Sequence, residues 1–122
     1  MTLHMGNDYF VPFSIPQTEL LAGTTIEVVA PVDGFVNEIL GVVQADVTTG
    51  GVISVKIGTV DVTGLALTVA DAATKGTTYS DEATQPSAVR KVAKGDRIQV
   101  VPAAEFATAG AINGLLRINT GK

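Results

Sequence analysis

The sequence predicts an all-β fold: an antiparallel β-sandwich or small barrel of about eight strands, with at most one or two short helical turns. Val, Ile and Thr supply about a third of the 122 residues, and these side chains, branched at Cβ, pack well on a pleated sheet. Glycines (13) and prolines (5) punctuate the chain, and turn signals recur about every 8 to 12 residues, as in sandwiches and small barrels. No long helical pattern alternates with the strands, which argues against a parallel βαβ fold.

The expected elements follow from turn residues and from apolar alternation. Two prolines in segment 9–16 favour an edge strand or an extended arm, and Gln17–Ala22 predicts one helical turn closed by the glycine that follows it. Gly41 inside a strand indicates a bulge or a close approach of two backbones. Segment 70–87 is expected to be a long polar loop with a short helix near 71–75. Strands are expected over 24–30, 35–44, 52–57, 60–63, 65–69, 88–93, 97–101 and 111–119.

The length of the chain fits a single domain. We expect residues 1–8 to form a flexible N-terminal tail, 9–119 a single sandwich with 9–16 as an edge strand or an extended arm, and 120–122 a C-terminal tail. With 46% hydrophobic and 16% charged residues the chain is too apolar to be disordered. It begins without a signal-peptide pattern, and no apolar run reaches the ~20 residues of a membrane span. The formal charge of -4 argues against nucleic acid as a partner. We therefore expect binding neither to nucleic acid nor to a membrane.

Groups that carry catalysis or bind metals are scarce in this sequence. Cysteine is absent, and the single histidine, His4, lies in the expected tail. A Ser-His-Asp triad and a zinc site would both need more than this inventory supplies. We therefore predict a protein that is not an enzyme and has no catalytic residue, no cofactor and no metal site.

The acidic residues have simple structural interpretations. Asp71, Asp81 and Glu82 lie in or beside the long loop, but they lack the spacing of a calcium-binding EF-hand. We interpret them as solvated loop acids and leave cation binding by this loop open. Asp33 and Asp96 adjoin turn glycines, where we expect their carboxylates to accept hydrogen bonds from local backbone.

Two groups of residues are candidates for a protein interface. Tyr9, Phe10 and Phe13 form the densest aromatic cluster of the chain, and they either plug one end of the core or form an arm that docks on a neighbour. Arg90 and Lys91 belong to a set of basic residues concentrated in the last third of the sequence. That set is either a positive patch for an acidic partner or an ordinary polar strand face.

One segment resembles a different small β-sandwich. Residues 29–39 are similar to the opening of a biotinyl or lipoyl carrier domain. That resemblance implies a modified lysine at a hairpin tip further along the chain. Lys56 is the nearest candidate, but it lacks the flanking residues of such a site and falls inside an expected strand. The carrier domain is therefore a remote alternative.

Three segments together resemble the jelly-roll structural proteins of bacteriophages. They are 22–36, 49–58, and 92–100 taken with 108–118. In this order they cover most of the chain and are similar to short capsid decoration (cement) proteins of tailed phages. The resemblance implies a jelly-roll sandwich whose function lies in its surfaces, so no site residue is carried over from the family.

The function that this resemblance implies is structural. We expect a virion protein, made in the host cytoplasm, that binds the outer face of the major capsid protein shell and stabilises it. We also expect it to associate with itself, as a homotrimer in preference to a homodimer. The alternative is a receptor- or carbohydrate-binding β-sandwich module of a phage fibre or tail. Absence of tryptophan disfavours that alternative, because sugar platforms usually use exposed aromatic rings.

Overall fold

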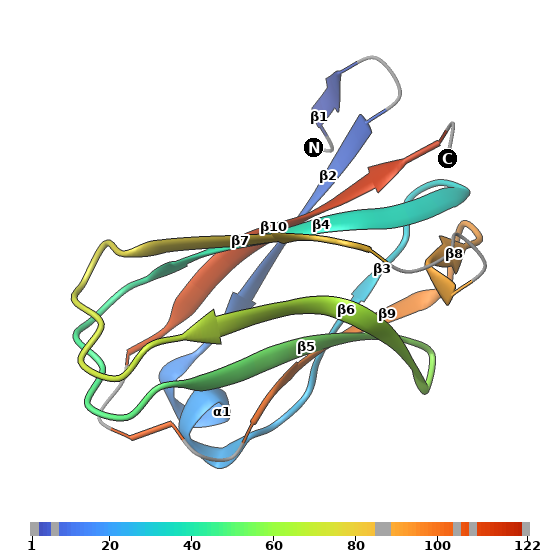
Figure 1. Ribbon diagram of the computed structural model, residues 1–122. Helices are drawn as coiled ribbons and strands as arrows, with labels where there is room; N and C mark the ends of the chain where they lie inside the picture. The colour runs from blue at the N-terminus through green and yellow to red at the C-terminus, as the bar shows by residue number, and fades with distance from the viewer. Residues whose placement is uncertain (1–2, 6–7, 85–88, 104–105, 108–109, 121–122) are drawn as a thin grey trace.

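Two antiparallel β-sheets pack face to face in the computed structural model of the chain (Figure 1). The structure describes residues 3–5, 8–84, 89–103, 106–107 and 110–120. Because each sheet buries one face against the other, a single apolar core lies between them. Within the described residues, no helix has both the length and the apolar character that a membrane crossing requires.

The strand order is that of a jelly roll. The large sheet has the order β1-β2-β10-β4-β7, with β8 also paired to β4, and the small sheet has the order β3-β9-β5-β6. The chain therefore passes repeatedly between the sheets, as two interleaved Greek keys require. The predicted all-β sandwich is confirmed. The strands are β1 (Leu3–Met5), β2 (Asp8–Ile15), β3 (Ile26–Val29), β4 (Gly34–Val43), β5 (Gly51–Ile57), β6 (Val60–Val69), β7 (Thr78–Glu82), β8 (Lys91–Val92), β9 (Arg97–Pro102) and β10 (Ile112–Asn119).

The core is built from alternate residues of the strands, because successive side chains of a strand point to opposite faces. In β10, for example, Ile112, Leu116 and Ile118 are at most 1% exposed, while Asn113 and Leu115 between them face solvent. Both sheets contribute, so the core is continuous. Its largest fully buried side chains include Ile15, Ile39, Ile53, Leu65, Leu67, Ile98, Ile112, Leu116 and Ile118.

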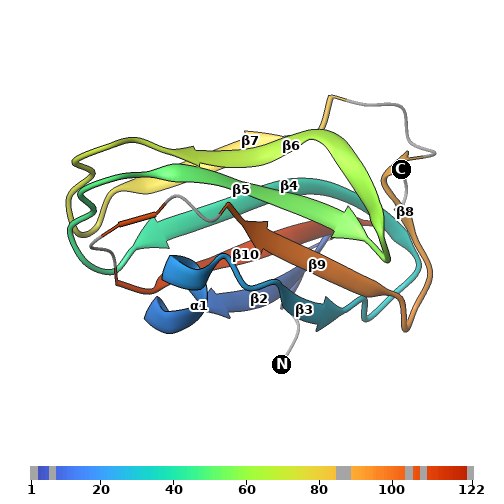
Figure 2. The same ribbon diagram turned by 90° about the horizontal axis from the view of Figure 1, so that it is seen from below.

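The predicted helical turn is confirmed as α1 (Gln17–Ala22). It ends at Gly23, whose φ of 72° lies in the left-handed region that glycine adopts without strain. Leu20 is 0% exposed, whereas its neighbour Leu21 is 38% exposed. The helix lies at one end of the sandwich, where the chain passes from the large sheet to the small one (Figure 2). Leu20 therefore closes that end of the core.

The predicted long loop at 70–87 is corrected, because it contains the strand β7. The short helix expected near 71–75 does not form. Instead, the Asp71 carboxylate accepts a hydrogen bond from Gly50 N–H over 2.8 Å, and Asp46 accepts one from Lys75 N–H over 2.8 Å. Such bonds between side chains and backbone compete with helical hydrogen bonding.

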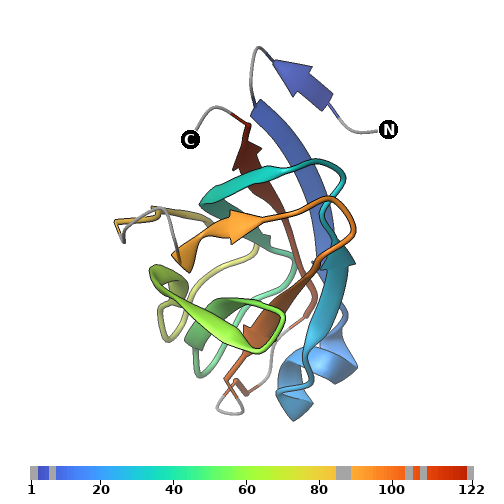
Figure 3. The same cartoon turned by 90° about the vertical axis from the view of Figure 1, so that its right-hand side faces the viewer.

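Other boundaries also differ from expectation. The two strands expected over 60–63 and 65–69 are one strand, β6, which passes through Gly64 at a φ of 83°. Part of the expected N-terminal tail forms β1, and Asp8 already belongs to β2 (Figures 1 and 3). Segment 9–16 is therefore a sheet strand over most of its length. Of the strand expected at 88–93, Lys91–Val92 form β8, while residue 88 lies outside the described residues.

Candidate interaction surface

The solvent-facing side of the large sheet, here called the outer face, has its side chains in rows. Directly paired residues of neighbouring strands point to the same side of a sheet, so the register across β2, β10, β4 and β7 defines each row. Three rows cross the face. They are Phe10, Arg117, Glu38 and Glu82; then Pro12, Leu115, Leu40 and Ser80; then Ser14, Asn113, Val42 and Thr78.

A shallow, mainly apolar depression lies over the second and third rows. It has a volume of about 470 Å³. Its floor and walls are apolar, and Leu115 is 37% exposed. Hydroxyl and amide groups supply its polar edge, and no charged residue lines it. The outward-facing side chains around it are Leu40, Val42, Thr78, Ser80, Asn113 and Leu115.

Beneath the depression, two paired glycines let the backbone of the large sheet approach the core side chains closely. Gly41 of β4 is in register with Gly114 of β10, and both would direct a side chain inward. A Cβ on Gly41 would lie 2.8 Å from Leu67 Cδ1, and one on Gly114 would lie 2.5 Å from Phe13 Cζ. Only glycine permits this close approach, which was one of the two interpretations of Gly41 from the sequence. The depression lies over the two glycines.

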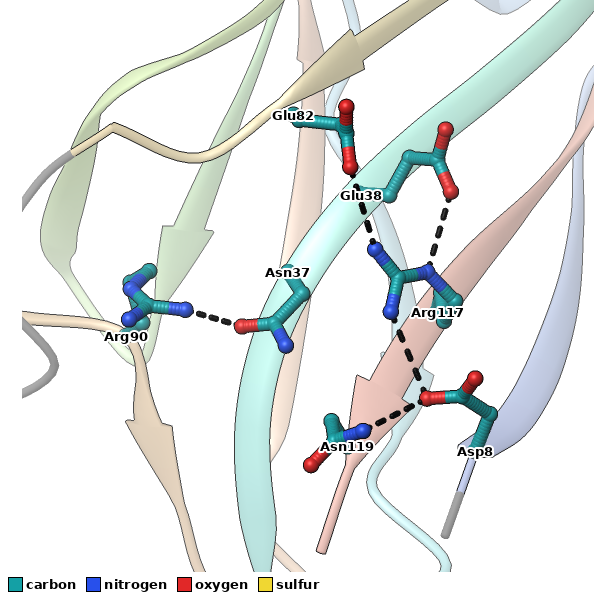
Figure 4. A network of polar contacts seen from close by, with 7 residues as sticks. All are labelled: Asp8, Asn37, Glu38, Glu82, Arg90, Arg117 and Asn119. Atoms are coloured by element: carbon teal, nitrogen blue, oxygen red, sulfur yellow. Dashed lines mark hydrogen bonds and ion pairs between the residues drawn. The ribbon is translucent and has the colours of Figure 1, made fainter. Parts of the chain in front are cut away.

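A network of charges occupies the first row, beside the depression (Figure 4). The Arg117 side chain is only 18% exposed and contacts three carboxylates. Its Nε donates to Glu38 Oε1 over 3.0 Å, Nη1 to Asp8 Oδ1 over 3.3 Å and Nη2 to Glu82 Oε2 over 3.5 Å. Asn119 Nδ2 also donates to Asp8, over 2.8 Å. This Arg117 network therefore ties β10 to β2, β4 and β7, and its three carboxylates and one guanidinium sum to a charge of -2.

The network stabilises the charged form of its arginine. Burial by itself lowers the pKa of Arg117, but hydrogen bonds to Glu38 and Asp8 and the charges of both carboxylates raise it by more, so the pKa lies above its ordinary value. The guanidinium is therefore charged under all ordinary conditions. Its planar fork suits several carboxylates at once.

The five residues predicted as an interface are distributed over different parts of the molecule. Phe13 is in the core at 5% exposure, whereas Phe10 is half-buried in the first row of the outer face and Tyr9 is half-buried on the opposite side of β2. Arg90 donates to Asn37 Oδ1, and its guanidinium lies 6.0 Å from the centre of the Phe35 ring. Lys91 is exposed on β8. Phe10 is thus the member of this set that belongs to the outer face.

The other candidate residues form structural hydrogen bonds or lie within strands. Asp81 Oδ2 accepts a hydrogen bond from Ala66 N–H of β6 over 2.9 Å. Glu82 joins the Arg117 network, and Asp71 binds Gly50, so the three loop acids do not converge. Among the described residues, no group of three or more His, Asp and Glu side chains could hold a metal ion. His4 lies in β1, in register with Tyr9. Lys56 lies within β5 opposite Asp61, one residue pair before the β5–β6 turn at residues 58–59.

Sequence reasoning missed the residues that form the depression. Leu40, Val42 and Leu115 lie in expected strands, but strand propensity does not tell which side of a sheet a residue faces. A usable signal was present: Leu40-Gly41-Val42 and Asn113-Gly114-Leu115 each place a glycine between two larger residues. Each triplet puts its glycine on one side and both neighbours on the other.

Fold and surface together define a small jelly-roll sandwich with an apolar depression on one sheet face. No protein-family model and no curated protein sequence matches the chain. Among solved structures, the chain is similar to a cycloisomaltooligosaccharide glucanotransferase of Paenibacillus sp., with 12% sequence identity and a TM-score of 0.35. That match covers 78% of this chain and 12% of the glucanotransferase chain. A likeness of this size defines neither a family nor an activity.

Proposed function

We propose that the protein is a virion structural protein, a decoration protein that docks on the capsid shell of a tailed phage through the outer face of its large sheet. The observation that carries this proposal is the depression, a charge-free apolar area on a face made of paired strands. Contiguous apolar areas that stay exposed on a folded protein are candidate sites of contact with other proteins. The resemblance of three sequence segments to phage decoration proteins supplies the identity of the partner, the major capsid protein.

The distribution of charge on the outer face suits docking on a protein. Interfaces bury apolar groups at the centre and keep polar groups at the rim. Here Leu115 and Leu40 occupy the centre, and the charged groups of the first row are already paired with one another. The depression has no charged lining residue, so a partner can cover it and leave the first row, with its net charge of -2, at the rim. Burying an unpaired charge, the arrangement that costs most, is thereby avoided.

Rigidity also favours this function. The docking side chains project from β10, β4 and β7, so little conformational freedom is lost on binding. A shell presents many identical sites, and simultaneous contacts raise the overall affinity of an oligomeric binder well above that of one site. Each copy would bridge neighbouring shell subunits and so raise the free energy needed to separate them.

The aromatic residues favour a protein partner over a sugar. All six, four Phe and two Tyr, lie in the described part of the chain, and each is buried or half-buried. Tyr79 is turned to β6, where its hydroxyl accepts a hydrogen bond from Ala70 N–H over 3.2 Å. Carbohydrate sites instead expose aromatic platforms. Titration with soluble saccharides separates the two functions, because a carbohydrate module would saturate and a decoration protein would not respond.

Co-sedimentation tests the proposed function. Shells assembled from the major capsid protein encoded in the same genome are mixed with the chain and pelleted through a gradient. We expect wild type to pellet with the shells. Leu115→Glu should weaken binding by about a hundredfold, because it places a charge in the apolar centre. Thr68→Glu, an exposed residue of the small sheet, is the matched control and should bind normally. Absence of wild-type binding, or normal binding by Leu115→Glu, would refute the proposal.

A further inference from the structure

The free edges of the two sheets are protected to different degrees. Unpaired backbone groups of an edge strand are a template for pairing with another chain, and proteins usually block them. In β2, the segment after Phe10 contains Pro12. By the alternation of the β2–β10 ladder, the Pro12 nitrogen points away from β10 toward the free edge, where it has no N–H to donate. Strand β1 covers the residues before it. Strand β3 is four residues long and carries the charged Glu27, which pairs with Arg97.

Strand β6 is blocked by side chains of β7. Ala66 N–H of the strand is bonded to the Asp81 carboxylate over 2.9 Å, and Ala70 N–H, directly after the strand's last residue, is bonded to the Tyr79 hydroxyl over 3.2 Å. A second chain cannot pair with this edge without displacing both bonds. The strand that supplies them, β7, has no such cover on its own far side: among the described residues no strand pairs with it there, and no loop backbone binds its outward groups.

The register identifies which backbone groups of β7 are open. Val43 N–H donates to the Thr77 carbonyl over 3.0 Å, and Ala83 N–H donates to the Asn37 carbonyl over 2.8 Å. In an antiparallel ladder, residues alternate between bonding the partner strand and pointing away from it. Odd-numbered residues from 77 to 83 therefore bond β4. Thr78, Ser80 and Glu82, all exposed, direct their N–H and C=O groups to the open edge.

We infer that β7 pairs with β7 of a second copy of this chain, antiparallel and centred on Ser80. This register matches Ser80 with the partner copy's same residue, and Thr78 with Glu82, so all three open positions bond in both copies. No like charges face each other, because Glu82 meets a threonine hydroxyl and is already bonded to Arg117. An interface that matches itself in this way is the isologous contact of a two-fold dimer, which ranks second to a homotrimer in the expectation from the sequence.

The two-fold axis would stand perpendicular to the sheet, as it does for any antiparallel pair within one sheet. Both outer faces would therefore lie on the same side of the dimer, with their depressions flanking the axis. Such a dimer presents two docking areas to one surface. The pairing itself does not depend on the proposed function and is tested without any shell.

Cross-linking tests the register directly, since the chain has no cysteine. In Ser80→Cys the two thiols would face each other at a Cα separation of about 5.5 Å, within disulfide range. In Thr78→Cys, the matched control on the same strand and the same face, they would be about 13 Å apart along the strands. We expect Ser80→Cys to form a covalent dimer at least about tenfold faster than Thr78→Cys on mild oxidation. Equal rates would overturn the inference.

Amide hydrogen exchange of the wild-type chain is a second test that needs no substitution. Protection of the Thr78, Ser80 and Glu82 amides should increase with protein concentration, whereas that of Tyr79 and Asp81, which already bond β4, should not. Exchange of the three outward amides that is independent of concentration overturns the self-pairing. So does protection that appears only after capsid shells are added, because the edge would then serve the shell protein.

Discussion

Adjacent residues of β7 face opposite sides of the sheet and therefore bind different partners. Asp81 points inward to the edge of β6, and Glu82 points outward to Arg117. From the sequence, both residues are interpreted as loop acids, because no local pattern indicates a strand at these positions. At turns the local interpretation works better: the Asp96 carboxylate accepts a hydrogen bond from Ala93 N–H, as predicted. Asp33 binds Lys94 N–H, 61 residues away, a partner that only the folded chain brings near.

Substitution of Asp81 tests its role as a cap on β6. Asp81→Ala removes the acceptor of Ala66 N–H, and we expect a loss of about 1–2 kcal/mol in the free energy of unfolding. Asp81→Asn keeps an acceptor oxygen and should lose about half as much or less. Urea denaturation of the purified variants measures both. Equal stability of Asp81→Ala and wild type would show that the bond contributes nothing.

Of the two paired glycines of the large sheet, Gly114 is the one at which packing most clearly leaves no room for a side chain. An added Cβ would lie 2.0 Å from the Leu40 carbonyl oxygen, which is backbone and cannot rotate away. We expect Gly114→Ala to destabilise the fold by about 3 kcal/mol, measured by thermal unfolding. Thr68→Ala, at an exposed strand position, should change stability by about 0.5 kcal/mol or less. A Gly114→Ala variant as stable as that control would contradict the packing described here.

At the scale of single elements, strands with apolar alternation and the glycine-capped helix were predictable from the sequence, and β7 was not. Its inward residues are Tyr79 and Asp81, whose polar ends bind β6, and its outward residues are Thr78, Ser80 and Glu82. The strand is therefore polar on both sides and lacks the pattern on which sequence interpretation depends. Backbone pairing with β4, the two hydrogen bonds toward β6 and the packing of the Tyr79 ring against the core hold it in place.

Helix α1 allows a comparison between neighbouring leucines. Leu20→Ala leaves a cavity at the closed end of the sandwich, and we expect it to cost about 2–5 kcal/mol of stability. Leu21→Ala removes a largely exposed side chain and should cost about 1 kcal/mol or less. Chemical denaturation of both variants checks the difference. Similar losses for the two would mean that the helix does not close the core.

The Arg117 network joins four strands, so its loss should weaken the contacts between whole elements. Arg117→Ala should lower stability by about 2–3 kcal/mol, because it leaves three carboxylates close together without a cation. The Arg97–Glu27 pair has side chains 54% and 43% exposed, and Arg97→Ala should cost about 0.5 kcal/mol or less. Denaturation midpoints at low and high salt measure both, and a loss for Arg97→Ala as large as for Arg117→Ala would contradict this ranking.

The pH dependence of the same network follows from the raised pKa of Arg117. A cation whose pKa is higher in the folded state contributes stability that is complete below its ordinary pKa and is lost as pH rises through the folded value. That window lies in strongly alkaline solution. We therefore expect the stability difference between wild type and Arg117→Ala to stay constant from about pH 7 to about pH 10. A difference that disappears within this range would show that the ion pairs of Arg117 do not provide the stability assigned to them.

For the whole molecule, composition and turn spacing were enough to predict a sandwich, but the outer face of the large sheet was not predictable. Its rows combine β2, β10, β4 and β7, strands far apart in the chain, so no sequence window contains a row. The outer face joins two surfaces: a depression for the proposed shell contact and the open β7 edge for a second copy.

A reconstruction by electron cryomicroscopy of capsid shells saturated with the protein tests the central claim most directly. We expect density for a small sandwich on the shell exterior, with the outer face of the large sheet toward the shell and Leu115 at the contact. Density that presents the small sheet to the shell, or shells that stay bare at saturating protein, would contradict the account.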